Sequence, residues 1–343
     1  MKRLLSTFYV TTQGSYLHKE GETVVQEVGG KKEKQIPISY IDSIVCFGNV
    51  LCSPFLLGFC AERGVTVSFL TEYGRFMASV KGPVNGNVLL RRPQYRMADD
   101  EESTRKIAAA VISGKLANCR VVLSRTVRDH TAKVDTSALK KAISTLDQII
   151  DKLPFATTTD ELRGLEGQAA AKYFEVFNHL IISQKNDFVF NGRSRRPPLD
   201  EVNALLSFIY MLLMHDVRSA LETVGLDTEV GFLHRDRSGR HSLALDMMEE
   251  FRPIMADRLV LSLINRGQVK KSSFTKEASG AVKLNEATRK TIFTEYHARK
   301  QEEITHPYFE EKMKFGLLFF FQAKLLVGHI KGELEGYAPF FWR

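Results

Sequence analysis

One stretch of the sequence, residues 231–257, brings a histidine and three acids close together along the chain. It reads GFLHRDRSGRHSLALDMMEEFRPIMAD, with His234 ahead of a predicted helix that Ser242 can cap. At 100° per residue, one face of that helix carries Asp246, Glu249 and Glu250. Like charges on one turn repel one another, so a bound cation would explain the arrangement, and a solvated acidic face is the alternative.

Another acid stands out for its apolar surroundings. In the predicted helix ELRGLEGQAAAKYFEVF, Glu166 lies in the middle of the apolar stripe. Within about 60° of it lie Leu162, Ala169, Ala170, Tyr173 and Phe177. Burying an unpaired charge is costly, so Glu166 must be protonated, hydrogen-bonded, ion-paired or bound to a metal. An ion pair with an arginine and a metal ligand explain it equally well.

Arginines gather beside both groups of acids. The segment GRSRRPP contributes Arg193, Arg195 and Arg196, and Arg235, Arg237 and Arg240 surround His234. Such clusters grip phosphates bidentately or pair with surface acids. Because they stand beside candidate metal ligands, they favour a nucleic-acid substrate over a small one.

Composition sets the broad class. The chain has 343 residues, a formal net charge of +8 and ordinary hydrophobic content of 44%, which suits two domains and a polyanionic partner or simply good solubility. Its four cysteines show no CxxC spacing, so core thiols in a reducing cytoplasm are expected. The most apolar run, GLLFFF, falls far short of the roughly 20 residues of a membrane span. We therefore expect a soluble, cytoplasmic protein without a membrane segment.

The elements that must position these residues are of two kinds, which predicts an α+β fold. Residues 1–86 alternate like strands and predict a β-rich, sandwich-like N-terminal domain, with a hairpin across Gly21 and one helix capped by Ser53. Residues 87–98 are assigned to a linker. Residues 99–343 predict a larger all-α C-terminal catalytic domain.

Seven helices are predicted in that second domain. They cover about 99–126, 137–153, 160–183, 199–223, 242–265, 284–302 and 309–331, with Pro253 as a kink. A basic segment that contains glycine and serine, residues 267–283, lies between the fifth and sixth of these helices. It is expected to be a mobile loop in isolation.

Three long motifs resemble one known family. RGLEG, RSRRPPLDEVNALLSFIY and GFLHRDRSGRHSLALDMMEEFRP look like the helical domain of the universal CRISPR-associated integrase, the nuclease of the spacer-acquisition machinery. GRFMASVKG and NVLLRRPQYR are similar to the end of its β-domain and the linker. The motifs occur in family order and cover most of the chain.

The resemblance implies an active site with a divalent metal, Mg²⁺ or Mn²⁺. The family's metal-binding glutamate matches Glu166, its histidine matches His234, and its final acid matches Glu249, where many members have aspartate. Asp246 matches a recurring aspartate that would assist. In the family this site joins 3′-hydroxyl ends of a captured fragment to the CRISPR repeat by transesterification, and it also suits hydrolysis of branched DNA.

Two other function classes compete with this one. A non-catalytic, basic helical DNA-binding scaffold would keep the arginines but need no inward-facing Glu166. A carboxylate-bundle metalloenzyme would carry Glu-x-x-His pairs on two helices, and the sequence does not offer two such pairs.

The resemblance also implies an assembly, in which two homodimers are bridged by a dimer of a small ferredoxin-like adaptation partner. Locally, the apolar strands IDSIVCF and VTVSFLT exceed what one face of a small β-domain needs, which suggests burial against a second copy. The C-terminal PFFW should dock, and docking on its own helical domain is favoured over docking on the partner.

Overall fold

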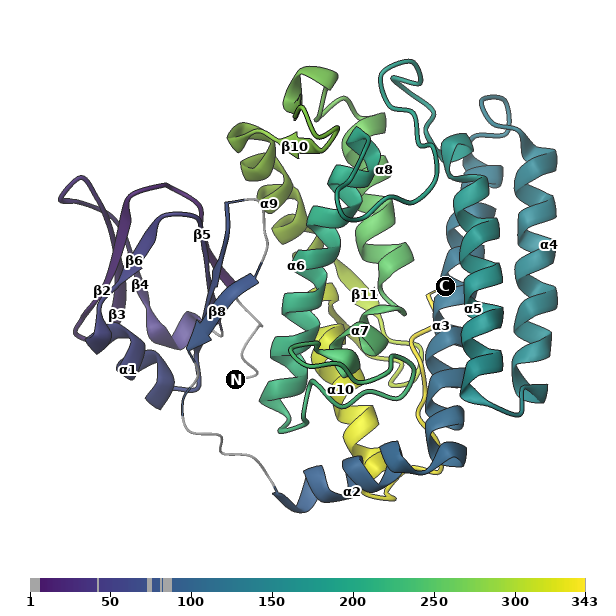
Figure 1. The fold of residues 1–343 in the computed structure, drawn as a ribbon, viewed down its shortest axis with the longest axis horizontal. Coiled ribbons are helices and arrows are strands. Elements are labelled where there is room, and N and C mark those ends of the chain that lie inside the picture. Colours follow the sequence, from purple (N-terminus) through teal and green to yellow (C-terminus); the bar gives the residue numbers. More distant parts are fainter. Residues whose placement is uncertain (1–6, 42, 73–75, 81, 83–87, 343) are drawn as a thin grey trace. The chain divides into compact units, whose positions relative to one another are not determined.

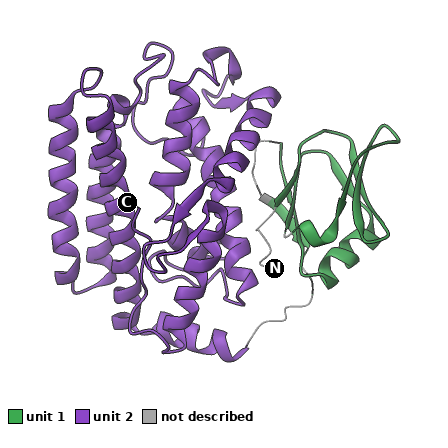
Figure 2. Ribbon diagram, turned by 180° about the vertical axis from the view of Figure 1, so that it is seen from behind, with its two compact units in different colours: residues 1–86 green, residues 87–343 purple. Residues whose placement is uncertain are grey.

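The computed structural model describes residues 7–41, 43–72, 76–80, 82 and 88–342. The chain divides into two compact units, Met1–Gly86 and Asn87–Arg343, coloured separately in Figure 2. The first is small and β-rich and the second is mainly helical, so the molecule has the mixed α+β character that the sequence predicts (Figure 1).

The N-terminal unit contains two four-stranded sheets and one helix. One sheet has the order β1-β5-β7-β8 and the other β4-β3-β2-β6. The strands are β1 (Thr7–Val10), β2 (Ser15–Glu20), β3 (Thr23–Val28), β4 (Lys31–Pro37), β5 (Ser43–Phe47), β6 (Val50–Cys52), β7 (Thr66–Leu70) and β8 (Phe76–Val80). The predicted hairpin is present, because β2 and β3 pair antiparallel across Gly21, which has a φ of 57°.

Local sequence signals account for the single helix of this unit, α1 (Pro54–Glu62). The Ser53 side chain accepts a hydrogen bond from the Leu56 amide, and Pro54 occupies the first helical position.

The four cysteines are free thiols, and three of them are buried. Strand β5 is buried at every position within the single chain, so its apolar sequence does not require a second copy, whereas Thr66 and Phe69 of β7 are only partly buried.

The predicted linker 87–98 is wrong for most of its length. Residues Val88–Asp99 form helix α2, which packs on the helical unit. Gln94 on this helix is fully buried, and its amide donates to the carbonyl oxygens of Asp227 and Val230 at 2.7 and 3.1 Å. The linker assignment followed the resemblance of NVLLRRPQYR to the family, and the sequence alone does not reveal this long-range anchoring of Gln94.

Three helices lie side by side in the second unit (Figure 1). They are α3 (Glu101–Asp129), α4 (Thr136–Lys152) and α5 (Thr159–Glu175). Their starts follow local rules, since Asp100, Asp135 and Thr158 each accept hydrogen bonds from the first-turn amides. Helix α5 ends at Glu175 and not near residue 183, because a short 3-10 turn over Phe177–Leu180 follows it.

The remaining helices are α6 (Glu201–Thr223), α7 (Ser242–Met248), α8 (Arg258–Asn265), α9 (Glu286–Gln301) and α10 (Phe315–Ile330). The helix predicted over 242–265 is interrupted, since α7 ends at Met248 and a π-helical segment, Arg252–Asp257, leads into α8. Pro253 lies in that segment, as expected of a residue that removes a backbone donor. Ser242 is the first helical residue and not the cap.

Two short hairpins occur where the sequence predicted none. Across the segment 267–283, β9 (Phe274–Lys276) pairs with β10 (Val282–Leu284), so the segment contains a hairpin where an irregular loop was predicted. Strands β11 (Glu303–Thr305) and β12 (Lys312–Lys314) form the second hairpin and delay the start of α10 to Phe315.

Among the described residues, two helices are long and apolar enough to cross a membrane by length and composition, contrary to the expectation from the sequence. They are α3 and α6, and 61% and 72% of their most apolar windows are buried inside the protein. Central helices of a globular core pass the same test, and both of these pack on several neighbouring helices.

Candidate active site

Glu166 lies midway along α5, where it meets a lysine from the neighbouring helix α3. The Lys115 ammonium donates a hydrogen bond to Glu166 Oε1. The ion-pair alternative considered from the sequence is therefore present, although the partner is a lysine and not an arginine. A Cβ atom on Gly164 or Gly167 would meet nothing within 4 Å, so the surface of α5 beside Glu166 is open.

Glu249 follows α7 directly and is buried between two cations. Its Oε2 lies 2.7 Å from Lys115 Nζ, and its Oε1 lies 2.6 Å from the Arg252 guanidinium. Burial by itself would raise the pKa of this carboxyl, but Arg252, Lys115 and His234 together lower it to about 2. Glu249 is therefore a carboxylate at any physiological pH.

Lys115 joins the two acids, which come from distant parts of the sequence. Its side chain is 9% exposed and contacts both Glu166 and Glu249. Burial lowers the pKa of the Lys115 amine, but Glu249 and Glu166 raise it by more, so the net shift is upward. The lysine is a fixed positive charge at the point where the two carboxylates converge.

Asp246 positions His234. Its carboxylate accepts hydrogen bonds from His234 Nδ1 at 2.6 Å and from the backbone amides of Phe232, Leu233 and His234. This contact turns the imidazole so that Nε2 is free to bind a ligand. Gly231 is needed here, because a Cβ at that position would lie 2.8 Å from Asp246 Oδ2.

The sequence-predicted site residues are thus brought together in part. Glu166 and Glu249 meet at one ammonium, and His234 is near enough to lower the pKa of Glu249. Within the described part of the chain, no three His, Cys, Asp or Glu side chains converge closely enough to hold a metal ion. The Lys115 ammonium occupies the space between the two carboxylates.

The three acids predicted on one helix face, Asp246, Glu249 and Glu250, are all buried, so the solvated-face alternative was wrong. Each acid has a separate task, and Glu250 turns away from the site. The Glu250 carboxyl accepts hydrogen bonds from the Tyr337 hydroxyl at 2.6 Å and from the Phe340 amide at 2.8 Å. Burial raises the pKa of Glu250 to about 8, although these hydrogen bonds lower it.

The C-terminal segment docks on its own helical unit, as favoured from the sequence. Asn118 on α3 donates to the carbonyl oxygens of Glu250 and Phe340 and accepts from the Trp342 amide. The Trp342 ring lies 3.8 Å from the Arg125 guanidinium and 4.3 Å from that of Arg258. We call residues Tyr337–Trp342 the C-terminal strap.

The arginines near His234 differ in their partners. Arg235 pairs with Asp160 at 2.8 Å, whereas Arg237 is exposed and Arg240 is half-buried. Arg163 on α5 also contacts Asp160 and donates to the Leu233 carbonyl oxygen at 2.6 Å. That hydrogen bond ties the His234 loop to the helix that carries Glu166.

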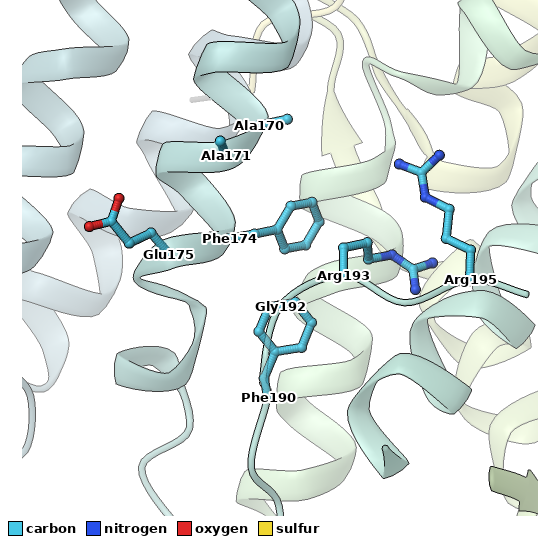
Figure 3. Close-up of a pocket in the computed structure, with 8 residues that line it drawn as sticks. All are labelled: Ala170, Ala171, Phe174, Glu175, Phe190, Gly192, Arg193 and Arg195. Atoms are coloured by element: carbon cyan, nitrogen blue, oxygen red, sulfur yellow. The ribbon is translucent and has the colours of Figure 1, made fainter. Parts of the chain in front are cut away.

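The other arginine cluster borders an open pocket of about 390 Å³. Figure 3 shows the Phe174 and Phe190 rings facing it, with Arg193 and Arg195 beside them and Glu175 pointing away. Arg193 is engaged internally, because it donates to Asn203 Oδ1 at 2.6 Å and lies over the Tyr210 ring. Arg195 and Arg196 are exposed.

A small cavity of about 30 Å³ lies next to this pocket and is bordered by Lys115, Glu166 and Arg252. It shares Arg195 and Phe174 with the larger pocket. Its volume is enough for a water molecule or a bare metal ion. The open pocket and the charged cluster are therefore neighbours that share lining residues.

Sequence reasoning missed the two cations of the site, although a signal for one was present. Lys115 is placed in the sequence as Glu166 is, with apolar residues one turn away on either side, Val111 and Cys119. An inward-facing lysine and an inward-facing glutamate on two predicted helices are natural partners. Arg252 gave no such signal, because it becomes buried only through the break after α7.

Comparison with known proteins identifies the family. The family model described as CRISPR associated protein Cas1 matches residues 8–298. The chain belongs to the Cas1 family. A relative from Chlorobaculum tepidum, named CRISPR-associated endonuclease Cas1 1, is 54% identical over 343 residues, and the match covers all of both chains. The resemblance drawn from the three motifs is confirmed.

Two solved structures share the Cas1 fold with this chain. A casposase bound to its integration product has a TM-score of 0.84 and 22% identity, over 99% of this chain and 95% of the casposase. A chain of a Cas6-RT-Cas1–Cas2 complex has a TM-score of 0.83 and 21% identity, over 100% of this chain and 36% of that one. At these identities the likeness establishes the fold alone.

Proposed function

We propose that this chain is a divalent-metal-dependent DNA endonuclease and integrase that inserts captured DNA fragments into a CRISPR array. A 3′-hydroxyl of the fragment would attack a phosphodiester of the repeat. The observation that supports this most is the convergence of Glu166 and Glu249 on one cation beside an oriented His234. The endonuclease name of the 54% identical relative agrees with it.

The donor types at the site suit a metal ion, although in this structure the Lys115 ammonium stands between the two carboxylates. Glu249 Oε2 is buried and, among the described residues, accepts no hydrogen bond, although the Lys115 ammonium lies 2.7 Å away. Glu166, Glu249 and His234 Nε2 are the groups that would hold Mg²⁺ or Mn²⁺. Such an ion supplies positive charge that stabilises the attacked phosphate and the leaving oxygen.

The other residues bind and orient. Asp246 fixes the His234 ring, and Arg163 holds that loop against α5. Arg195 and Arg196 are exposed beside the open pocket and are suited to contact DNA phosphates, as is Arg237 near His234. Arg193 and Arg235 already have partners within the protein, so we propose that they stabilise this surface.

The rival reading, a non-catalytic DNA-binding scaffold, is less well supported. A scaffold needs exposed arginines but has no use for two carboxylates gathered on a cation at the end of a pocket.

The assembly expected from the family is also part of the proposal. We infer that the chain forms a homodimer in the cytoplasm, and that a dimer of a small ferredoxin-like partner bridges two such dimers. The Cas6-RT-Cas1–Cas2 complex, whose Cas1-like chain shares this fold, is the kind of assembly we expect.

Strand transfer with purified protein tests the proposed function. Duplex and branched DNA would be offered with Mg²⁺, with Mn²⁺ or with EDTA. We expect Glu166→Ala, His234→Ala and Glu249→Ala each to lower transfer by roughly a hundredfold or more while leaving DNA affinity nearly unchanged. Glu175→Ala, an exposed position on the same helix, is the matched control. Full activity in EDTA would contradict metal dependence.

Asp246→Asn should be milder than the loss of a ligand. The amide keeps one acceptor oxygen for the loop but orients His234 less well, so we expect a roughly 10–100-fold loss of transfer. A loss equal to that of Glu249→Ala would make Asp246 a ligand in its place.

A further inference from the structure

The carboxylate pair is neutralised by the chain's own cations. Glu166 and Glu249 carry two negative charges, and Lys115 and Arg252 carry two positive charges in direct contact with them. A divalent metal entering this cluster would therefore add two positive charges to a balanced set. Close to a buried ammonium, that excess is unfavourable unless an anion arrives with the metal.

Lys115 and Arg252 do not have equal parts in this balance. Arg252 has its ion pair with Glu249, and its guanidinium also lies 4.9 Å from the Tyr210 ring. Lys115 contacts both carboxylates and stands on the long helix α3 with almost no exposed surface. It is the one described cation that occupies the space between Glu166 and Glu249.

The surroundings of Lys115 restrict where its ammonium can move. Its neighbour Gly114 packs so closely on the C-terminal strap that a Cβ would lie 3.0 Å from Pro339 Cβ and 3.2 Å from Glu250 Cγ. The backbone of α3 is therefore fixed behind the site. Lys115 lines the small cavity beside the open pocket, so that cavity gives its side chain room to rotate away from the carboxylates.

We propose that Lys115 is a positioning residue that holds Glu166 and Glu249 together in the absence of metal and makes tight metal binding depend on DNA. This inference rests on the metal-dependent function proposed above. A DNA phosphate entering from the arginine-lined pocket supplies negative charge. That charge offsets the excess positive charge that arises when the metal ion is added beside Lys115 and Arg252. The site then gains its metal together with its substrate.

Metal titration separates this role from a purely structural one. Mn²⁺ binding would be measured by calorimetry for wild type and Lys115→Met, each with and without duplex DNA whose 3′ ends are dideoxy-blocked. We expect DNA to tighten Mn²⁺ binding to wild type by about tenfold or more. Lys115→Met should bind Mn²⁺ about tenfold more tightly than wild type without DNA, and DNA should add little.

Lys106→Met provides the matched control, because Lys106 is an exposed lysine on the same helix that pairs with Glu102. Its Mn²⁺ affinity should equal that of wild type. Equal or weaker Mn²⁺ binding by Lys115→Met in the absence of DNA would overturn the inference.

Thermal unfolding in EDTA gives a readout that does not depend on metal. Without its counter-ion the carboxylate pair repels, so we expect Lys115→Met to unfold roughly 5–10 °C below wild type. An unchanged midpoint would also overturn the inference. If Lys115→Met does not fold, Lys115→Arg keeps the charge and should keep the dependence of Mn²⁺ affinity on DNA, and loss of that dependence would refute the proposal.

Failure of the proposed function would look different. Strand transfer by wild type that persists in EDTA would remove the metal from the reaction. The EDTA unfolding of Lys115→Met would still show whether Lys115 holds the two acids together.

Discussion

Glu249 and Glu250 are adjacent in the chain and equally buried, yet their surroundings are opposite. Glu249 lies between Lys115 and Arg252, and its pKa falls to about 2. Glu250 has no such cation, and its pKa rises to about 8 despite three donors that reach it. Burial alone favours the neutral acid, and only charges of opposite sign reverse that preference. The pair shows that neighbouring cations keep a buried acid ionised and suited to chemistry. Where the fold brings hydrogen bonds in place of cations, the buried acid is suited to a structural role.

Replacing each acid by its amide should give the largest difference in strand transfer between the two positions. We expect Glu249→Gln to reduce strand transfer by roughly a hundredfold or more, because it removes a negative ligand, while Glu250→Gln keeps transfer within about threefold. An amide mimics the neutral carboxyl and can still bond to Tyr337 and the Phe340 amide. Transfer assays on the two variants decide the point, and equal losses would mean that both acids serve the reaction.

The next largest effect, on the free energy of unfolding, is expected in the C-terminal strap. Phe340 is fully buried against Phe251, whereas its neighbour Phe341 is 40% exposed. Phe340→Ala should lower the free energy of unfolding by roughly 3–5 kcal/mol, and Phe341→Ala by less than about 1 kcal/mol. Urea unfolding of both variants measures the difference. Equal, small losses would show that the strap is not part of the helical core in solution.

His215 extends the comparison to a buried base without a counter-ion strong enough to keep it charged. Burial and the neighbouring Arg218 and His241 lower its pKa to about 4, which the nearby Asp216 and Glu222 do not offset. Between about pH 4 and 6.5 the unfolded chain then binds the extra proton, so stability falls as the pH falls. The cost reaches about 3 kcal/mol below pH 4 and is absent above pH 7.

His215→Leu should remove that slope. Urea unfolding of wild type and variant at pH 7 and pH 4.5 should show the variant about 2–3 kcal/mol less sensitive to acid. Parallel losses in the two proteins would place the acid sensitivity in other groups.

The smallest effect is expected at the surface arginines. Replacing exposed Arg195 and Arg196 by glutamine should reduce the slope of log affinity for DNA against log salt by about 2, since each lost phosphate contact releases about 0.9 fewer counterions. Arg193→Gln should instead lower stability, because its guanidinium bonds Asn203. Filter binding over a salt series, with melting curves, separates the two. An unchanged slope for the double variant would assign these arginines to internal pairs.

Local signals in the sequence predicted elements better than they predicted connections. The cap of α1 at Ser53 and the hairpin across Gly21 depend on neighbouring residues, and both are present. Helix α2 and the β9–β10 hairpin depend on distant partners: Gln94 reaches Val230, and the Val282 amide donates to the Pro198 carbonyl oxygen. No periodicity over a short window contains those contacts.

The site followed the same division. Glu166 could be singled out because an acid in an apolar stripe must have a partner, and His234 and Glu249 were matched by motif. The sequence did not reveal which residue each of these side chains contacts. Asp246 bonds the loop before it, Glu249 meets Lys115 from α3, and Glu250 meets the strap, and all of these partners are distant from the acids in the sequence or lie outside their helix.

The position of the strap in the chain also orders events during synthesis. Glu166, His234 and Glu249 leave the ribosome well before Tyr337–Trp342, which contact Asn118 and Glu250 behind them. Until those late residues arrive, Asn118 lacks two of its bonds. Contacts of such large sequence separation form slowly. A chain still in synthesis therefore carries all the predicted site acids before the strap can support the helix that holds Lys115.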